Sequence, residues 1–249
     1  MTDLVRAELL KLRTTRTFWW TVAAALVFVP VSVAIAISGP GGPDAPTLDS
    51  TEGFRNVIGA SSSGGILMIL IGIFAMAGEF RFNTITSTFL ITPDRKRVVG
   101  AKLIATGLVG VAVGVVASAL CLAVALPWLS ARHVSLGNHI ADIVIVVLGG
   151  IASTALGGVV GVALGSVLVN QTLAIAFTLV WMLLVENMLT TLRPGVGRWF
   201  PGGAANAVSG ISPADGSLLP IWAAALLLLA YAGVFSTLGG RFVIRRDIT

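Results

Sequence analysis

The residues that could do chemistry gather in one polar segment, residues 78–102, which lies between two long apolar runs. The segment carries the carboxylate of Glu79 and a basic cluster, Arg95-Lys96-Arg97. Basic side chains of this kind can pair with an acidic partner surface, or with anionic lipid at about 1 kcal/mol each. Topology alone would also explain the charges, but it would not explain the ordered Thr-Ile-Thr sequence ahead of them. We therefore expect this segment to dock onto something in the aqueous phase.

The residue patterns that would support catalysis within the chain itself are missing. The sequence has no G-x-x-x-x-G-K-[ST] loop for ATP and no H-E-x-x-H for a metalloprotease. His133 and His139 form only a weak zinc pattern, with Asp142 as the nearest carboxylate. Ser209 has no histidine in or near the later apolar runs to act as its base. We predict that the chain is not an enzyme and has no catalytic, cofactor-binding or metal-binding residues of its own.

The composition indicates the environment in which these residues must be held. Of the 249 residues, 56% are hydrophobic and only 11% are charged, with a mean hydropathy of +0.96. A soluble domain carries about 25% charged residues, so this chain cannot cover a water-facing surface. We predict an all-α, polytopic membrane protein. Its net charge of +5 is then a matter of membrane topology rather than of nucleic-acid binding.

Six apolar runs are long enough to cross a bilayer core of about 30 Å, which needs roughly 20 helical residues. The expected transmembrane helices are at about 18–38, 57–77, 103–126, 140–165, 172–189 and 218–238. Residues 1–17 precede them as a basic interfacial helix, in which Glu8 and Lys11 flank an imperfect apolar stripe. The whole chain, 1–249, is thus expected to be a single transmembrane domain.

Basic residues are distributed unevenly between the two sides of these spans. Twelve of the sixteen Lys and Arg residues precede the first span, lie in residues 78–102 or end the chain. The positive-inside rule therefore places both termini and residues 78–102 in the cytoplasm. No ionisable residue lies near the middle of an expected span, and Asp142 and Glu186 are interpreted as solvated carboxylates near span ends. This pattern argues against ion-coupled transport, which usually needs a charge at mid-membrane.

Two further stretches have open alternatives. Small residues recur at every fourth position of the fourth span, and such ladders let helices approach closely, either within one subunit or between two. The helix-packing positions are Gly149, Ser153, Gly157, Gly161 and Gly165. Residues 190–217 either dip back into the membrane as a short helix near residues 203–208 or form an ordinary interfacial loop.

Residues 78–102 resemble part of the permease subunits of ABC-2-type ABC transporters, of the small six-span bacterial kind. The resemblance is carried by Gly78-Glu79-Phe80-Arg81, Thr84-Ile85-Thr86, Pro93, Arg95-Lys96-Arg97 and Ala101-Lys102. Residues 8–14 and 201–205 also resemble that family, so the similarity extends over nearly the whole chain. One departure is Asn83, where such proteins often have Gly.

The resemblance implies the membrane-spanning permease subunit of an ATP-driven exporter in the bacterial plasma (inner) membrane. Its partners would be separate ABC ATPase subunits, which bind ATP and Mg, a second copy of itself or a homologous permease, and membrane lipid, but no nucleic acid. In that family the first cytoplasmic loop docks into a groove on the ATPase. The partner-binding candidates are then Glu79, Arg81, Thr84, Ile85, Thr86, Pro93, Arg95, Arg97 and Lys102.

One alternative uses the same residues for a different purpose. The chain would be a non-transporting scaffold, sensor or immunity protein that recruits a cytosolic partner through residues 78–102. If it does transport, spans of Ala, Val, Leu and Gly without a central charge suggest an apolar or amphipathic cargo.

Overall fold

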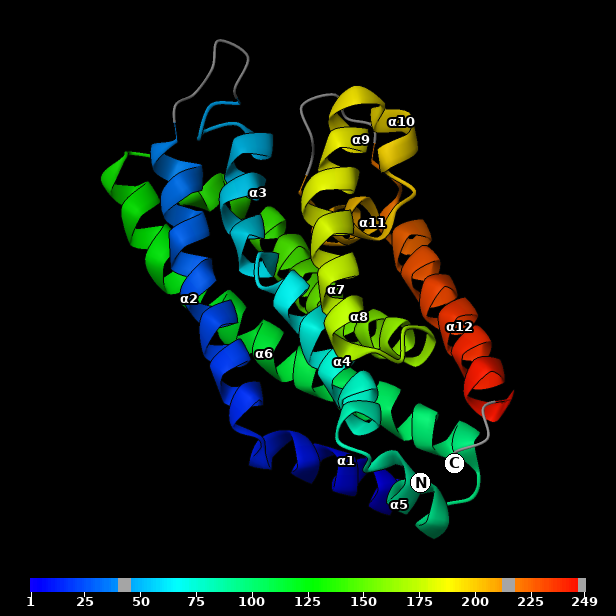
Figure 1. Cartoon of the computed structure of the whole chain (residues 1–249). Helices are drawn as coiled ribbons and strands as arrows, with labels where there is room; N and C mark the ends of the chain where they lie inside the picture. The colour runs from blue at the N-terminus through cyan, green and yellow to red at the C-terminus, as the bar shows by residue number, and fades with distance from the viewer. Residues whose placement is uncertain (40–45, 212–217, 246–249) are drawn as a thin grey trace.

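The computed structural model describes residues 1–39, 46–211 and 218–245, and these form a bundle of helices (Figure 1). Six helical segments of the described part are long and apolar enough to cross a membrane, which confirms the predicted fold class. The first is α2 (Arg16–Ser38) and the last is α12 (Ile221–Arg245). Parts of two expected loops and of the expected basic tail, at 40–45, 212–217 and 246–249, lie outside the described residues.

The second span is a broken helix. It consists of α3 (Thr51–Gly59), the 3-10 turn η1 (Ala60–Ser62) and α4 (Gly65–Arg81). The helix begins earlier than the expected boundary at residue 57, because Ser50 caps it. The Ser50 hydroxyl accepts a hydrogen bond from the Gly53 N–H at 3.1 Å, which satisfies one of the free amides of the first turn.

The third span also extends further than expected. It is α6 (Arg95–Ala131), whose 37 residues correspond to about 55 Å of helix. Asp94 caps its start by accepting hydrogen bonds from the N–H groups of Lys96 and Arg97. Residues 78–102, the polar segment between the second and third spans, are therefore largely helical. They contain the end of α4, the short helix α5 (Ile85–Ile91) and the start of α6.

The fourth span, α7 (Ile140–Val167), lies at the centre of the bundle and packs against α4, α6 and α12. Its ladder of small residues lies against other elements of the same chain. A methyl group at Gly161 would overlap the carbonyl oxygen of Ile69, and one at Gly157 would lie 3.2 Å from that of Gly65, both on α4. A methyl group at Gly165 would lie 3.1 Å from the Cβ of Met76, also on α4. Packing within one chain thus accounts for this part of the ladder.

The fifth span leads into a short buried helix. The span consists of α8 (Gln171–Val180), the π-helix η3 (Trp181–Glu186) and α9 (Asn187–Leu192), and α10 (Pro194–Gly197) and α11 (Pro201–Val208) follow. The two remaining ladder positions on α7 face α11. A methyl group at Gly149 would overlap the carbonyl oxygen of Val208, and the Ser153 hydroxyl donates to the Ala205 carbonyl at 3.2 Å. Of the two alternatives for residues 190–217, the described part therefore contains the short helix, packed against α7 and α12.

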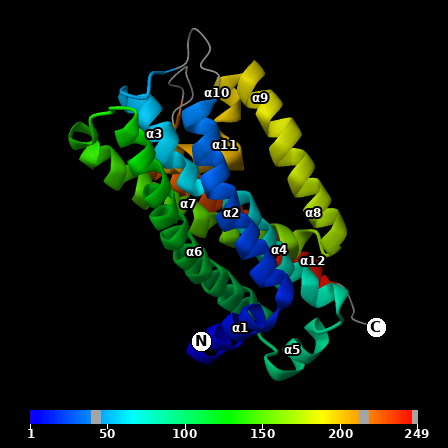
Figure 2. The same cartoon turned by 90° about the vertical axis from the view of Figure 1, so that its left-hand side faces the viewer.

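Helix α1 (Thr2–Thr14) lies across one end of the bundle, and α5 lies beside it in both views (Figures 1 and 2). We call this the α1 end, and we call the end that holds α10 and α11 the α11 end. That the α1 end is cytoplasmic remains a prediction from the charges.

Candidate functional site

Two lysines and two glutamates from three helices form a buried ion network at the α1 end. Glu8 and Lys11 come from α1, Glu79 from the last turn of α4, and Lys102 from near the start of α6. Lys102 Nζ lies 2.6 Å from Glu8 Oε2 and 2.8 Å from Glu79 Oε1. Lys11 Nζ lies 2.8 Å from Glu8 Oε1 and 2.7 Å from the same Glu79 Oε1. The two positive and two negative side chains balance one another.

Burial differs between the two cations of this ion network. The side chain of Lys102 has no exposed surface, whereas that of Lys11 is 47% exposed. The carboxylates of Glu8 and Glu79 are both buried. A buried charge is tolerated only where it is paired and hydrogen-bonded, and Lys102 meets this requirement by donating to two carboxylates at once. Lys102 therefore joins α6 to both α1 and α4.

Lys11 lies at the water-facing edge of the ion network. Partial burial lowers the pKa of its ammonium group, but the hydrogen bonds to Glu79 and Glu8 outweigh burial and raise the pKa above the ordinary value of 10.5. Lys11 is thus charged at neutral pH. It also donates to the hydroxyl of Thr88 at 3.5 Å, and this contact ties α1 to α5.

The turn between α4 and α5 connects α5 to the same glutamate. The N–H of Thr84 donates to the Glu79 carbonyl at 2.9 Å, and the Thr84 hydroxyl donates to that carbonyl at 3.4 Å. Asn83 allows this tight turn by adopting a φ of 55°. Only Gly and, less readily, Asn or Asp enter this left-handed region at low cost. The departure from Gly at position 83 therefore preserves the turn.

The structure divides the predicted partner-binding residues into an inner and an outer group. Glu79 and Lys102 lie in the ion network, and Ile85 is buried at the base of α5. The remaining six residues lie outside the ion network: Arg81, Thr84, Thr86, Pro93 and Arg97 are exposed, and Arg95 is half-buried. Sequence reasoning thus placed structural and surface residues together in one set.

The outer surface of this segment combines basic and apolar side chains. Phe82 and Leu90 are 70% and 79% exposed, which is unusual for such large apolar residues beside so many charges. The guanidinium of Arg81 lies 5.6 Å from the centre of the Phe82 ring. Exposed apolar side chains rimmed by polar ones are typical of interaction sites. Helix α5 and the turn before it thus expose apolar and basic side chains next to the ion network.

Sequence reasoning missed Glu8 and Lys11 as members of the site. Both had been noted as residues that flank the apolar stripe of the first helix and as part of residues 8–14, which resemble the family, but not as partner-binding residues. Glu8 shares the inward face of α1 with Leu12, and both are buried. A carboxylate within an apolar stripe was therefore the available signal, because a partner cation must meet it in the fold.

Other candidate residues have structural partners. Asp142 pairs with Arg55 at 2.7 Å and lies 3.1 Å from Nδ1 of His139, so its interpretation as a solvated carboxylate was wrong. The ring of His139 stacks on Phe54, and the hydroxyl of Ser209, which follows the end of α11, donates to the Ala205 carbonyl of that helix. Across residues 1–39, 46–211 and 218–245, no three His, Cys, Asp or Glu side chains come together as metal ligands.

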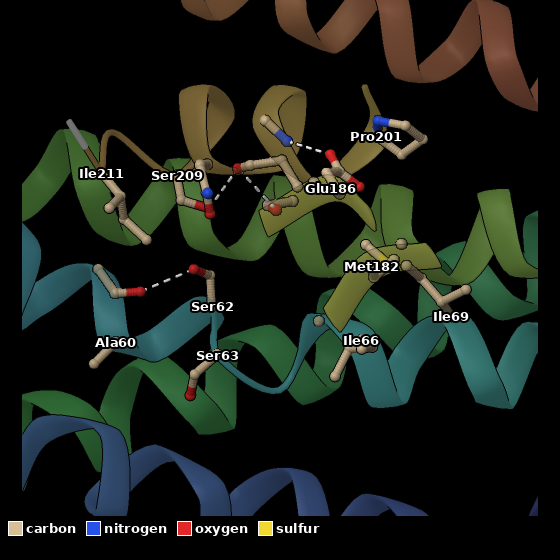
Figure 3. A pocket seen from close by; sticks show the side chains of 18 of the residues that line it. Ala60, Ser62, Ser63, Ile66, Ile69, Met182, Glu186, Pro201, Ser209 and Ile211 are labelled. Carbon is tan, nitrogen blue, oxygen red and sulfur yellow. Dashed lines mark hydrogen bonds between the residues drawn. The ribbon is translucent and has the colours of Figure 1, made fainter. Parts of the chain in front are cut away.

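Glu186 also differs from its expected environment. It was interpreted as a solvated carboxylate, but only 3% of the residue is exposed. Its side chain lies in the wall of a cavity of about 410 Å³ between the spans (Figure 3). This cavity is separate from the ion network, since the two share no residue.

Comparison with known protein families gave one match. A model of the family described as ABC-2 family transporter protein matches residues 4–186. The matched stretch contains the whole ion network, α5 and most of the first five spans. No curated protein matches the chain closely enough to count as a relative.

Proposed function

The chain belongs to the ABC-2 transporter family and is a membrane-spanning permease subunit of an ABC transporter, and we propose that it exports its substrate with energy from ATP hydrolysis by a separate ATPase. One observation carries the proposal of ATPase coupling. Helix α5 and its flanking residues present exposed apolar and basic side chains, while the ion network links the base of α5 to α1, α4 and α6.

The contacts of α5 explain how a push from outside the membrane would reach the spans. Lys11 and the turn at Thr84 link α5 to α1 and α4, and Lys102 links both to α6. Helices α4 and α6 pack closely against α7 through glycines, which leave no space for independent sliding. Movement of α5 is therefore expected to move the three helices together, as rigid packed elements do.

The partner ATPases would bind ATP and Mg and would close on each other during the cycle. Their groove would take up α5, and burial of Phe82 and Leu90 there would contribute about 3–6 kcal/mol together at full burial. Arg81 and Arg97 would pair with acidic groups at the rim of that groove. We expect these charges to determine mainly the association rate and the specificity.

A second permease chain completes the proposed transporter, in the bacterial plasma membrane. Only 17% of the hydrophobic window is buried in the fifth and in the sixth span, compared with 67% in the second. The exposed faces of α8, α9 and α12 are therefore available to lipid or to the second chain. The substrate would pass between the two chains, toward the α11 end.

The docking step is tested by co-purification from native membranes. We expect the wild-type chain to retain an ATPase that has no spans of its own, and Leu90→Asp to reduce the retained ATPase at least about tenfold, which corresponds to 1.4 kcal/mol. Leu192→Asp is the matched control, because it places the same charge at a similarly exposed leucine of the α11 end. Retention of the ATPase by Leu90→Asp would contradict docking through α5.

The transport step needs a separate measurement. With the purified complex in inverted vesicles, an exporter takes up a hydrophobic dye only when ATP is supplied. A scaffold, sensor or immunity protein would keep its cytosolic partner but show no ATP-dependent uptake. The two assays together distinguish recruitment of an ATPase from work done by it.

A further inference from the structure

The cavity beside Glu186 has the size and position of a ligand site. Its volume of about 410 Å³ falls in the usual range of roughly 300–1,000 Å³ for small-molecule pockets. It lies beside residues at mid-length of two spans, including Gly65 of the second and Ser153 of the fourth. Helix α11 and the π-helix η3 form further parts of its wall (Figure 3), together with residues of α2, α9 and α12.

Glu186 is held with one oxygen engaged and the other unpaired. Its Oε1 accepts a hydrogen bond from the Gly203 N–H of α11 at 2.8 Å. Its Oε2 is buried and has no hydrogen-bond partner among the described residues. Glu186 is the last residue of the six-residue π-helix η3. In a π-helix the side chains occupy different positions around the axis than in a regular α-helix. Such π-helical turns are rare and occur frequently at functional sites.

Two further polar atoms of the cavity wall are buried without a partner, Asn56 Oδ1 and Ser63 Oγ. The hydroxyl of Ser62, which also lines the cavity, is satisfied because it donates to the Gly59 carbonyl at 2.8 Å. The unpaired Asn56 Oδ1 is an acceptor, and the unpaired oxygen of Glu186 is an acceptor in the ionised carboxylate. Among the described residues, no lysine, arginine or histidine lines the cavity. What the cavity lacks is therefore a hydrogen-bond donor that carries positive charge.

We propose that this cavity binds a small molecule with a protonated amine, whose ammonium group donates to Glu186 Oε2 and Asn56 Oδ1. The apolar part of the ligand packs against the aliphatic wall, which includes Ile66, Ile69 and Val160. A buried carboxylate without a counter-ion is costly, and an ammonium ligand supplies the missing charge and the missing donors together.

The test measures binding to the purified full-length chain in lipid nanodiscs, without any ATPase. The probe is dansylcadaverine, a fluorescent primary amine, and its control is the N-acetylated derivative, which has the same fluorophore but no charge. Signal from empty nanodiscs is subtracted. We expect saturable binding of the amine at least ten times tighter than that of the acetylated compound. Equal affinity for the two compounds, or binding of neither, overturns the proposal.

A pair of variants assigns the effect to the carboxylate. Glu186→Gln keeps a carbonyl oxygen for the Gly203 N–H but removes the charge, and we expect its affinity for the amine to fall to that of the acetylated compound. Ser62→Ala lines the same cavity and removes only a hydroxyl already bonded to Gly59, so its affinity is expected to stay within twofold of wild type. Unchanged amine binding by Glu186→Gln overturns the proposal.

The two probes are compared on the wild-type chain, so the result does not depend on the folding of any variant. The result also does not depend on export or on docking at α5, because no ATPase is present. Failure of amine binding and failure of ATPase coupling are thus separate outcomes.

Discussion

Replacing Lys102 by Met removes the buried cation that joins three helices while keeping an unbranched side chain with an apolar stem. Glu8 and Glu79 then remain buried with only Lys11, which is 47% exposed, to neutralise them. Removing one partner of a buried ion pair costs about 3–5 kcal/mol, because the other charge is left uncompensated. Lys11 already contacts both carboxylates, so we expect a loss near the lower limit, about 3 kcal/mol.

The measurement is the free energy of unfolding of the purified chain, from a denaturing-detergent titration followed by far-ultraviolet circular dichroism. Lys96→Met is the matched control, because it makes the same substitution at an exposed position of the same helix. Its effect is expected to stay within about 0.5 kcal/mol.

A double variant separates the ion network from general packing. Combining Lys102→Met with Glu8→Gln removes one of the two uncompensated carboxylates, so the combined loss should be smaller than the sum of the single losses. Groups in one ion network couple by about 0.5–3 kcal/mol. Additive losses, or a loss below about 1 kcal/mol for Lys102→Met alone, would refute the structural role given to this lysine.

Three further predictions follow from single positions. Gly161→Val pushes a side chain into the Ile69 carbonyl and should cost at least about 1–3 kcal/mol in the same unfolding assay, whereas Gly233→Val, which has open space around it, should cost much less. Asn83→Gly should keep the stability of the chain, and Asn83→Val should lose about 1–2 kcal/mol, because a branched residue resists the φ of 55°. Because the pKa of Lys11 is raised in the fold, the free energy that this lysine contributes to stability is fully present below pH 10.5 and is lost as the pH rises through the folded-state pKa. The difference in unfolding free energy between wild type and Lys11→Met should therefore be constant at neutral pH and shrink only in stronger alkali.

Continuous apolar runs made the six spans predictable, because a bilayer imposes their length. The helix ends were less predictable. The second span starts at Thr51 and the third at Arg95, in both cases among polar residues. Ser50 and Asp94 cap these ends, so the helices continue beyond the apolar runs that hydropathy detects.

The ion network was half predictable for a related reason. Glu79 and Lys102 lie at span boundaries next to a conspicuous polar segment. Their partners on α1 are distant in sequence: Lys11 and Glu79 are 68 positions apart, and Glu8 and Lys102 are 94 positions apart. A single sequence gives no measure of such pairings. The burial of Glu186 was not predicted. Glu186 is the last residue of a π-helix, which changes the face that this residue occupies, and regular helical periodicity does not indicate that change.

The separation of 94 residues between Glu8 and Lys102 also sets an order of events during synthesis. At roughly 5–20 residues per second, Lys102 is made about 5–20 s after Glu8. During that interval Lys11, three residues along the same helix and 2.8 Å away in the finished fold, is the cation at hand for Glu8. The ion network is complete only when the third helix arrives. A nascent chain that stops before α6 would therefore display α5 without the support of Lys102, so the proposed docking of the ATPase is expected only once half of the membrane domain exists.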